Sequence, residues 1–209
     1  MLHYKRTIHS IVLLTLFVTE GRCMFLSHQN IEECINTGAI IIGPDFDKKN
    51  IRPVGVRIHL GPSLLIAQPG QTIDLTTSAH LEYKEIDLAT EEFYLEPGQF
   101  VLGSTYETIQ TAPNILAMLD GRSTIARLGL TVHVTASVID GTFEGPHSAV
   151  LEIKNLGDFR IRLKFKDPVA MMLFVELKDP VVQKLQSQYS QTSNKVVAPN
   201  LGFKTGSDK

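Results

Sequence analysis

Cysteine is scarce in this sequence: Cys23 and Cys34 are the only two in 209 residues. Two thiols at this spacing supply neither a Cys-x-x-Cys pair nor a cysteine-rich zinc site. They are also too few for a scaffold of several disulfides. The shortage excludes those classes of protein without naming a function.

An excess of charge of one sign is lacking as well. Twenty Lys and Arg side chains stand against 22 Asp and Glu, for a formal net charge of −2. A nucleic-acid polymer requires a strongly basic surface, so we expect no such partner. Hydrophobic residues make up 43% of the chain, which is enough for a core and excludes wholesale disorder.

Long hydrophobic runs are missing too. The apolar run at 11–18 is too short to cross a bilayer core of about 30 Å, so we expect no membrane partner. Two basic residues precede it, as in a secretory signal, but residues 19–23 hold no small-x-small cleavage site. We interpret residues 1–23 as a hydrophobic leader or upstream extension before a natural start at Met24, with a signal peptide as the alternative. A cytoplasmic location is expected, and export is the minor alternative.

The remaining sequence changes its hydrophobic period once. Ser27 is placed to cap a short helix that Gly38 ends. After it, apolar and polar residues alternate with the period of half-buried strands. The alternating segments are residues 54–60, 132–138 and 161–165, and turn signals stand at 61–62, 69–70, 97–98 and 155–157. Many short strands with regular turns predict an all-β barrel or sandwich.

The chain therefore divides into three parts. Residues 1–23 are the leader, and residues 24–177 form one β domain. In residues 178–209, Asp179 and Pro180 can start a final helix, which a polar tail follows. We expect that tail to be mobile, or to become ordered only on a ligand or a neighbour.

One stretch interrupts the strand pattern and carries candidate chemistry. Gly121 and Gly129 bracket a segment of about two helical turns. Arg122, Ser123 and Thr124 gather at its start. Helix N-terminal amides, two hydroxyls and a guanidinium suit a phosphate group. The alternative is that both hydroxyls are simple helix caps.

A second candidate is the carboxylate of Glu152. Strand alternation places it on the face opposite Leu151 and Ile153. Such a carboxylate is ordinarily solvated surface. If Glu152 faces a pocket instead, burial would raise its pKa and suit it to proton transfer.

These two candidates belong to a longer series of motifs. The motifs are FYLEPGQF at 93–100, GRSTIARLGL at 121–130, VHVTA at 132–136, ID at 139–140 and LEIKN at 151–155. Together they resemble the dCTP deaminase family, a branch of the dUTPase-like superfamily. Their order and most of their spacings fit, and the resemblance covers residues 24–177. Glu152 within Leu-Glu-Ile favours a deaminase over a plain dUTPase.

The resemblance implies a distorted jelly-roll-like β-barrel with a short N-terminal helix, a helix around 122–128 and a C-terminal helix or tail. It also implies a homotrimer with active sites between subunits. The reaction that it implies is hydrolysis of a cyclic amidine C–N bond, which would convert dCTP and water to dUTP and ammonia without zinc. The sequence agrees, because it lacks the His-x-Glu and Pro-Cys-x-x-Cys signature of zinc deaminases.

Catalytic roles follow from the same resemblance. Glu152 would be the general base that takes a proton from water. Ser123 and the backbone around Thr135 and Ala136 would hold that water. Arg127 would lie beside Glu152 and keep it ionised, although it could instead be a plain interfacial ion-pair partner.

Nucleotide-binding roles follow as well. Arg122 and Thr124 would engage a triphosphate that carries Mg²⁺. Asp140 would lie near the sugar 3′-hydroxyl, although it could be a turn residue before a glycine. Tyr189 and Lys195 resemble the tyrosine and lysine that cover the nucleotide.

The chain departs from the family pattern in several places. Arg57 stands where the family usually has an acidic residue, and about two additional residues precede Glu152. An even insertion preserves the facing of a strand residue. Two alternatives stay open. One is a bifunctional enzyme that also converts dUTP to dUMP, with Asp140 activating water. The other is a non-catalytic trimer that binds pyrimidine nucleotides, which rests on the altered first motif and C-terminal tail. Regulation by dTTP stays open.

Overall fold

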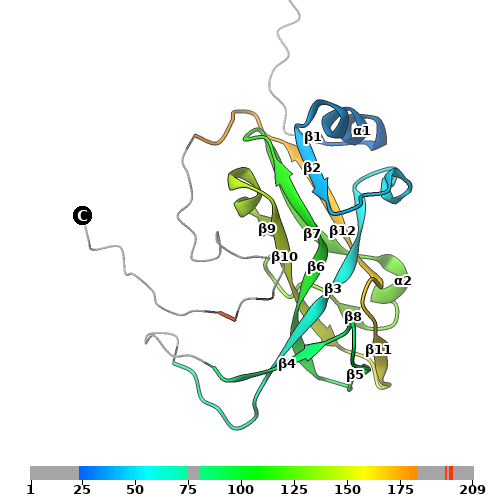
Figure 1. Ribbon diagram of the computed structural model, residues 1–209, viewed down its shortest axis with the longest axis vertical. Helices are drawn as coiled ribbons and strands as arrows, with labels where there is room; N and C mark the ends of the chain where they lie inside the picture. The colour runs from blue at the N-terminus through cyan, green and yellow to red at the C-terminus, as the bar shows by residue number, and fades with distance from the viewer. Residues whose placement is uncertain (1–23, 75–80, 183–195, 197, 200–209) are drawn as a thin grey trace, which may run out of the picture.

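The structure is a computed structural model that describes residues 24–74, 81–182, 196 and 198–199 (Figure 1). The helices are α1 (His28–Thr37), α2 (Ser123–Ala126) and two 3-10 turns, η1 (Lys48–Asn50) and η2 (Asp140–Glu144). The strands are β1 (Met24–Phe25), β2 (Ile40–Gly43), β3 (Val56–Ala67), β4 (Tyr83–Asp87), β5 (Phe93–Leu95), β6 (Phe100–Thr111), β7 (Ile115–Gly121), β8 (Leu130–Thr131), β9 (Val138–Ile139), β10 (His147–Asn155), β11 (Ile161–Leu163) and β12 (Pro168–Glu176).

Ten of these strands form one antiparallel sheet. Its main path is β8-β10-β6-β3-β12-β7-β9, and β1, β2 and β4 pair with β12, β6 and β3. The short ribbon of β5 and β11 lies at the end of the sheet opposite α1 (Figure 1). The all-β prediction is confirmed. Among the described residues, no helix is long and apolar enough to span a membrane.

Alternation along the strands separates the core from the outer face. In β12, the inward side chains of Ala170, Met172 and Phe174 are all fully buried. The side chains between them point to the opposite face, where Met171 and Leu173 are half-buried. The period of two thus places one apolar row in the core and leaves a second apolar row on the outer face.

The N-terminal helix follows its sequence signals. The Ser27 N–H and hydroxyl both donate to Asn30 Oδ1, at 3.3 and 2.8 Å. Ile31 is fully buried on the inner side of the helix. Gly38 ends the helix in the left-handed conformation, with φ at 78°. Both predicted helix boundaries are confirmed.

The predicted turn at Gly61 and Pro62 is wrong, because β3 continues through both residues. Gly61 lies so close to β6 that a Cβ there would sit 2.4 Å from Ser104 Oγ. The register between β3 and β6 shifts between Leu60 and Leu64. The two residues therefore mark an irregularity inside a strand, where a glycine permits close approach. The other three turn predictions are confirmed.

The predicted strand at 132–138 is also largely wrong. Only Val138 belongs to a strand there, β9, and residues 132–137 are irregular. The Val134 N–H donates to the Glu152 carboxylate at 2.7 Å. This N–H is therefore not available for a hydrogen bond to a neighbouring strand. The Ser137 carbonyl accepts from Leu119 N–H at 2.7 Å. Side-chain competition for backbone groups ends the strand.

Asn155, at the end of β10, holds several loops together. Its side chain is fully buried. Its Nδ2 donates to the carbonyl oxygens of Leu95 and Phe159, at 3.1 and 2.7 Å. Its Oδ1 accepts from the Gly157 N–H at 2.9 Å. This one side chain satisfies backbone groups of two different segments.

Replacing this amide should destabilise the fold. Asn155→Ala leaves three backbone groups without their partner, and we expect the free energy of unfolding to fall by about 2–4 kcal/mol. Urea unfolding followed by circular dichroism measures this. Asn114→Ala is the control, because its side chain makes no hydrogen bond within the described residues, and a change within about 0.5 kcal/mol is expected there. Equal losses in the two variants would contradict the role of Asn155.

Candidate active site

The first group of candidate residues surrounds α2. Arg122 takes the N-cap position, and its carbonyl accepts from Ala126 N–H at 2.9 Å. Ser123 and Thr124 follow on the first turn, and both are exposed. Neither hydroxyl makes a hydrogen bond within the described part of the chain. The simple-cap alternative therefore fails, and both hydroxyls are available to a ligand.

Arg122 reaches from this turn toward the neighbouring strands. Its Nη1 donates to the carbonyl oxygen of Pro168, the first residue of β12. Burial, and then the charges of Arg57 and Arg52, lower the pKa of Arg122. An arginine nevertheless stays protonated at neutral pH. Arg127, at the other end of α2, is exposed.

The second group of candidate residues surrounds Glu152 on β10. Leu151 and Ile153 are fully buried, and Glu152 points to the opposite face, as alternation predicted. One carboxylate oxygen, Oε2, accepts from Val134 N–H at 2.7 Å, and the Glu152 N–H donates to the Val132 carbonyl at 2.9 Å. The carboxylate is thereby fixed against the irregular segment 132–137.

The remaining candidate residues lie on segment 132–137 and at the start of η2. Thr135 and Ala136 are exposed on it, and Asp140 begins η2 directly after β9. Buried Thr142 anchors this turn, because its hydroxyl lies 3.0 Å from that of Thr111 on β6. Asp140 itself is exposed, and its carboxylate has no partner among the described residues.

The two groups of candidate residues share no side-chain interaction within the described part of one chain. No hydrogen bond or ion pair among the described residues joins Glu152 to Ser123 or Arg127. The pairing of Arg127 with Glu152 that the resemblance implies is therefore not made by a single copy. Tyr189 and Lys195 lie outside the described residues.

The sequence did not reveal a contact between His133 and Asp120. Their Nε2 and Oδ1 atoms lie 3.5 Å apart. The other ring nitrogen of His133 is buried and has no partner in the described part of the chain. A catalytic triad would also need a nucleophile in contact with the pair, and none contacts it among the described residues. Asp120 is the last residue but one of β7, and His133 lies in the irregular segment after β8, so only the fold brings the two side chains together.

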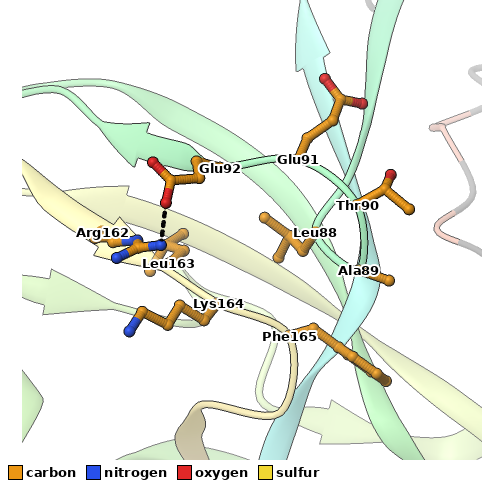
Figure 2. A pocket seen from close by; sticks show the side chains of 9 residues that line it. All are labelled: Leu88, Ala89, Thr90, Glu91, Glu92, Arg162, Leu163, Lys164 and Phe165. Carbon is orange, nitrogen blue, oxygen red and sulfur yellow. Dashed lines mark hydrogen bonds and ion pairs between the residues drawn. The ribbon is translucent and has the colours of Figure 1, made fainter.

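A surface hollow lies apart from both groups of candidate residues. Figure 2 shows it between the loop before β5 and strand β11. Its volume is about 310 Å³. An ion pair between Arg162 and Glu92 crosses its rim. None of the candidate residues lines this hollow. Its wall consists of Leu88, Ala89, Thr90, Glu91, Glu92, Arg162, Leu163, Lys164 and Phe165.

The geometry on α2 and β10 agrees with a match to a known family. Residues 25–177 match the model of the family described as dCTP deaminase-like. The chain belongs to this family. The match begins and ends within a residue or two of the β domain expected from the sequence, and it includes both groups of candidate residues of this dCTP deaminase-like chain.

Curated relatives agree over most of their length. A dUMP-forming dCTP deaminase of Methanosphaera stadtmanae is 35% identical over 162 residues, which cover 74% of this chain and 80% of the relative. A dCTP deaminase of Buchnera aphidicola is 36% identical over 171 residues, which cover 77% of this chain and 88% of the relative. These relatives support the resemblance to the dCTP deaminase family that the sequence motifs indicated.

A solved structure supports the fold. The crystal structure of 2′-deoxycytidine 5′-triphosphate deaminase from Agrobacterium tumefaciens aligns with 74% of this chain, at a TM-score of 0.57 and 17% identity. The aligned part spans about half of that solved chain, at 48%. At this identity the comparison establishes the shared fold, and the dUTPase-like architecture predicted for this dCTP deaminase-like chain is confirmed.

Proposed function

We propose that this chain hydrolyses dCTP to dUTP and ammonia, with Glu152 as the general base. The observation that carries the proposal is the fixed position of this carboxylate on β10. Its Oε2 accepts from Val134 N–H. Glu152 also lies within residues 25–177, which match the dCTP deaminase-like family. The second carboxylate oxygen has no partner among the described residues, so it can accept a proton from water.

The proposed reaction consists of attack by water on the cytosine ring and loss of ammonia. Glu152 removes a proton from a water molecule as the water oxygen attacks C4 of the cytosine ring. That proton passes to the ring nitrogen N3, and C4 becomes tetrahedral. The amino group leaves as ammonia after taking the second proton, and the carbonyl of uracil forms. The water oxygen remains on C4, and the carboxylate returns to its ionised state.

We also propose that the site is completed by a second copy of the chain, in a homotrimer. The proposal is supported by the lack of any hydrogen bond or ion pair between Glu152 and Ser123 or Arg127 among the described residues of one copy. Ser123 and Arg127 of one copy would then hold the water and orient Glu152 of another. The backbone around Thr135 and Ala136 would lie beside the base.

An apolar outer face is available for such assembly. Its side chains are cross-strand neighbours on β1, β12, β7 and β9. They are Phe25, Leu116, Met118, Val138, Leu173 and Val175, all half-buried or exposed. A contiguous apolar surface of this kind typically marks a contact between proteins.

The triphosphate would be bound at α2. Arg122 and Thr124 would contact its oxygens, and Asp140 would lie near the 3′-hydroxyl of the sugar. The described residues contain no group of three or more His, Cys, Asp or Glu side chains that could hold a metal ion. We therefore propose that Mg²⁺ enters on the oxygens of the triphosphate, which suit this cation.

A product assay tests the activity. Purified chain incubated with dCTP and Mg²⁺ is expected to release ammonia and dUTP in equal amounts, measured by a coupled ammonia assay and by nucleotide chromatography. The control is the same incubation with dUTP, which has no amino group to release. Absence of ammonia at saturating dCTP would contradict the proposed function and favour the non-catalytic binding trimer.

A bifunctional reaction is the second candidate, because the relative from Methanosphaera stadtmanae is named as dUMP-forming. In that case Asp140, exposed at the start of η2, would activate a second water for attack on the triphosphate. The same assay separates the two, since dUMP and pyrophosphate would replace dUTP as products.

A further inference from the structure

Two arginines that the sequence did not connect lie on the same outer face as Arg122. Arg57, the second residue of β3, is opposite Met171 of β12, and Met171 is opposite Asp120 of β7. Directly opposed residues point to the same face of a sheet. Arg122 follows Asp120 by two residues, so it begins on this face too. Arg52 lies in the turn that leads into β3.

The side chain of Arg122 extends from the end of β7 toward β3. Its Nη1 contacts the Pro168 carbonyl, and Pro168 is opposite His59 on β3. The guanidinium therefore lies over β12, the strand between β7 and β3. Arg57 is only two residues from His59 on the same face. Arg57 and Arg122 thus approach one area from two strands, and Arg52, whose charge helps to lower the pKa of Arg122, lies in the turn before β3.

This arginine cluster, Arg52, Arg57 and Arg122, has no counter-charge in the described part of the chain. No ion pair reaches any of the three, and Arg57 Nε is buried without a hydrogen-bond partner. The lowered pKa of Arg122 has the charges of Arg57 and Arg52 among its causes. Like charges at this range repel, so the cluster is destabilising unless an anion binds.

The nearby acids are engaged elsewhere. Asp120 accepts from the Gly121 N–H at 2.7 Å and lies beside His133. Glu107 is buried, with one oxygen 2.9 Å from the His59 N–H and the other 2.5 Å from the His59 ring. Neither carboxylate contacts an arginine of the cluster. The missing counter-charge must therefore come from outside the described chain.

We propose that the arginine cluster binds the terminal phosphates of the nucleoside triphosphate. The planar fork of arginine matches phosphate oxygens, and the cluster adjoins the two free hydroxyls on α2. The choice of dCTP as the nucleotide that carries these phosphates rests on the proposed function. The affinity of the cluster for a polyphosphate does not. Because Arg57 replaces the acidic residue that the family pattern has, this contact is a feature of the present chain.

Inorganic tripolyphosphate is the direct probe, since it has phosphates and no base. In calorimetry on the full chain, Arg57→Gln is expected to weaken its binding about tenfold, the typical loss for one charge-assisted contact. Arg57→Lys, which keeps the charge and loses the fork, should give an intermediate affinity. Arg160→Gln is the matched control, because it removes one positive charge from an exposed arginine that pairs with Glu96, and unchanged affinity is expected.

The outcomes separate the cluster from the deaminase activity. If Arg57→Gln weakens tripolyphosphate while the wild-type chain releases no ammonia, the cluster stands and the proposed function fails. If the affinity of Arg57→Gln equals that of wild type, the cluster is overturned whatever the activity. Dissociation of Arg57→Gln in sedimentation velocity would also overturn it, since the arginines would then pair with carboxylates of another copy. Should that variant not fold, Arg52→Gln, at an exposed position, must lower the affinity in its place.

Discussion

Glu152→Gln is expected to fold, to bind dCTP and to release ammonia about 10²- to 10⁴-fold more slowly than the wild type. The amide oxygen of the glutamine can still accept from Val134 N–H, as the carboxylate does at 2.7 Å. The irregular segment 132–137 should therefore keep its conformation. What the variant loses is the capacity to take a proton from water.

Turnover and binding must be measured together for this variant. The ammonia assay reports kcat, and calorimetry with dCTP reports affinity, which should change little. Glu82→Gln is the control, because it makes the same chemical change at an exposed residue before β4, and full activity is expected. Turnover of Glu152→Gln within about threefold of wild type would remove Glu152 from the role of base.

The parts of the fold that depend on neighbouring residues could be predicted. Helix α1 has its N-cap at Ser27 and its left-handed glycine at Gly38, because capping acts within a few positions of the chain. The facing of Glu152 followed from the period of two, and it held even though the strand has a bulge between Ser148 and Val150. Local chemistry and side-chain alternation were sufficient in both cases.

The parts that depend on distant residues could not. Residues 132–138 alternate as a strand should, yet the carboxylate of Glu152 takes the Val134 N–H from the ladder. Gly61 with Pro62 is a turn signal by composition, but the close approach of Ser104 on β6 keeps both residues within β3. Pairing between segments far apart in the sequence decided each outcome.

The candidate site shows the same limit at a larger scale. The motifs predicted roles for Ser123, Arg127 and Glu152, but no hydrogen bond or ion pair in the described chain joins the α2 group to Glu152. Contacts between copies form only on assembly, and the spacing of residues along one chain does not specify them. The arginine cluster could not be predicted from the sequence for a related reason, because Arg57 and Arg122 become neighbours only through β12.

Gly129→Ala is expected to cause the largest loss of stability near the site. Gly129 has φ at +77°, and a Cβ there would lie 2.7 Å from Gly157 N. Its carbonyl also accepts from Leu156 N–H at 2.7 Å, so the two segments cannot separate freely. Left-handed strain and overpacking together should lower the free energy of unfolding by about 2–5 kcal/mol.

Gly98→Ala isolates the contribution of the backbone conformation. Gly98 has nearly the same φ, +74°, but nothing lies within 4 Å of the added Cβ, so a loss of only about 1–2 kcal/mol is expected. Urea unfolding of both variants gives the difference that the close approach of Gly157 causes. Because Gly129 ends the segment that carries Ser123 and Arg127, the kcat/KM of Gly129→Ala for dCTP should also fall, while that of Gly98→Ala should not. Equal losses of stability would show that residues 156–157 yield to the added methyl group, and that the glycine is required for its conformation alone.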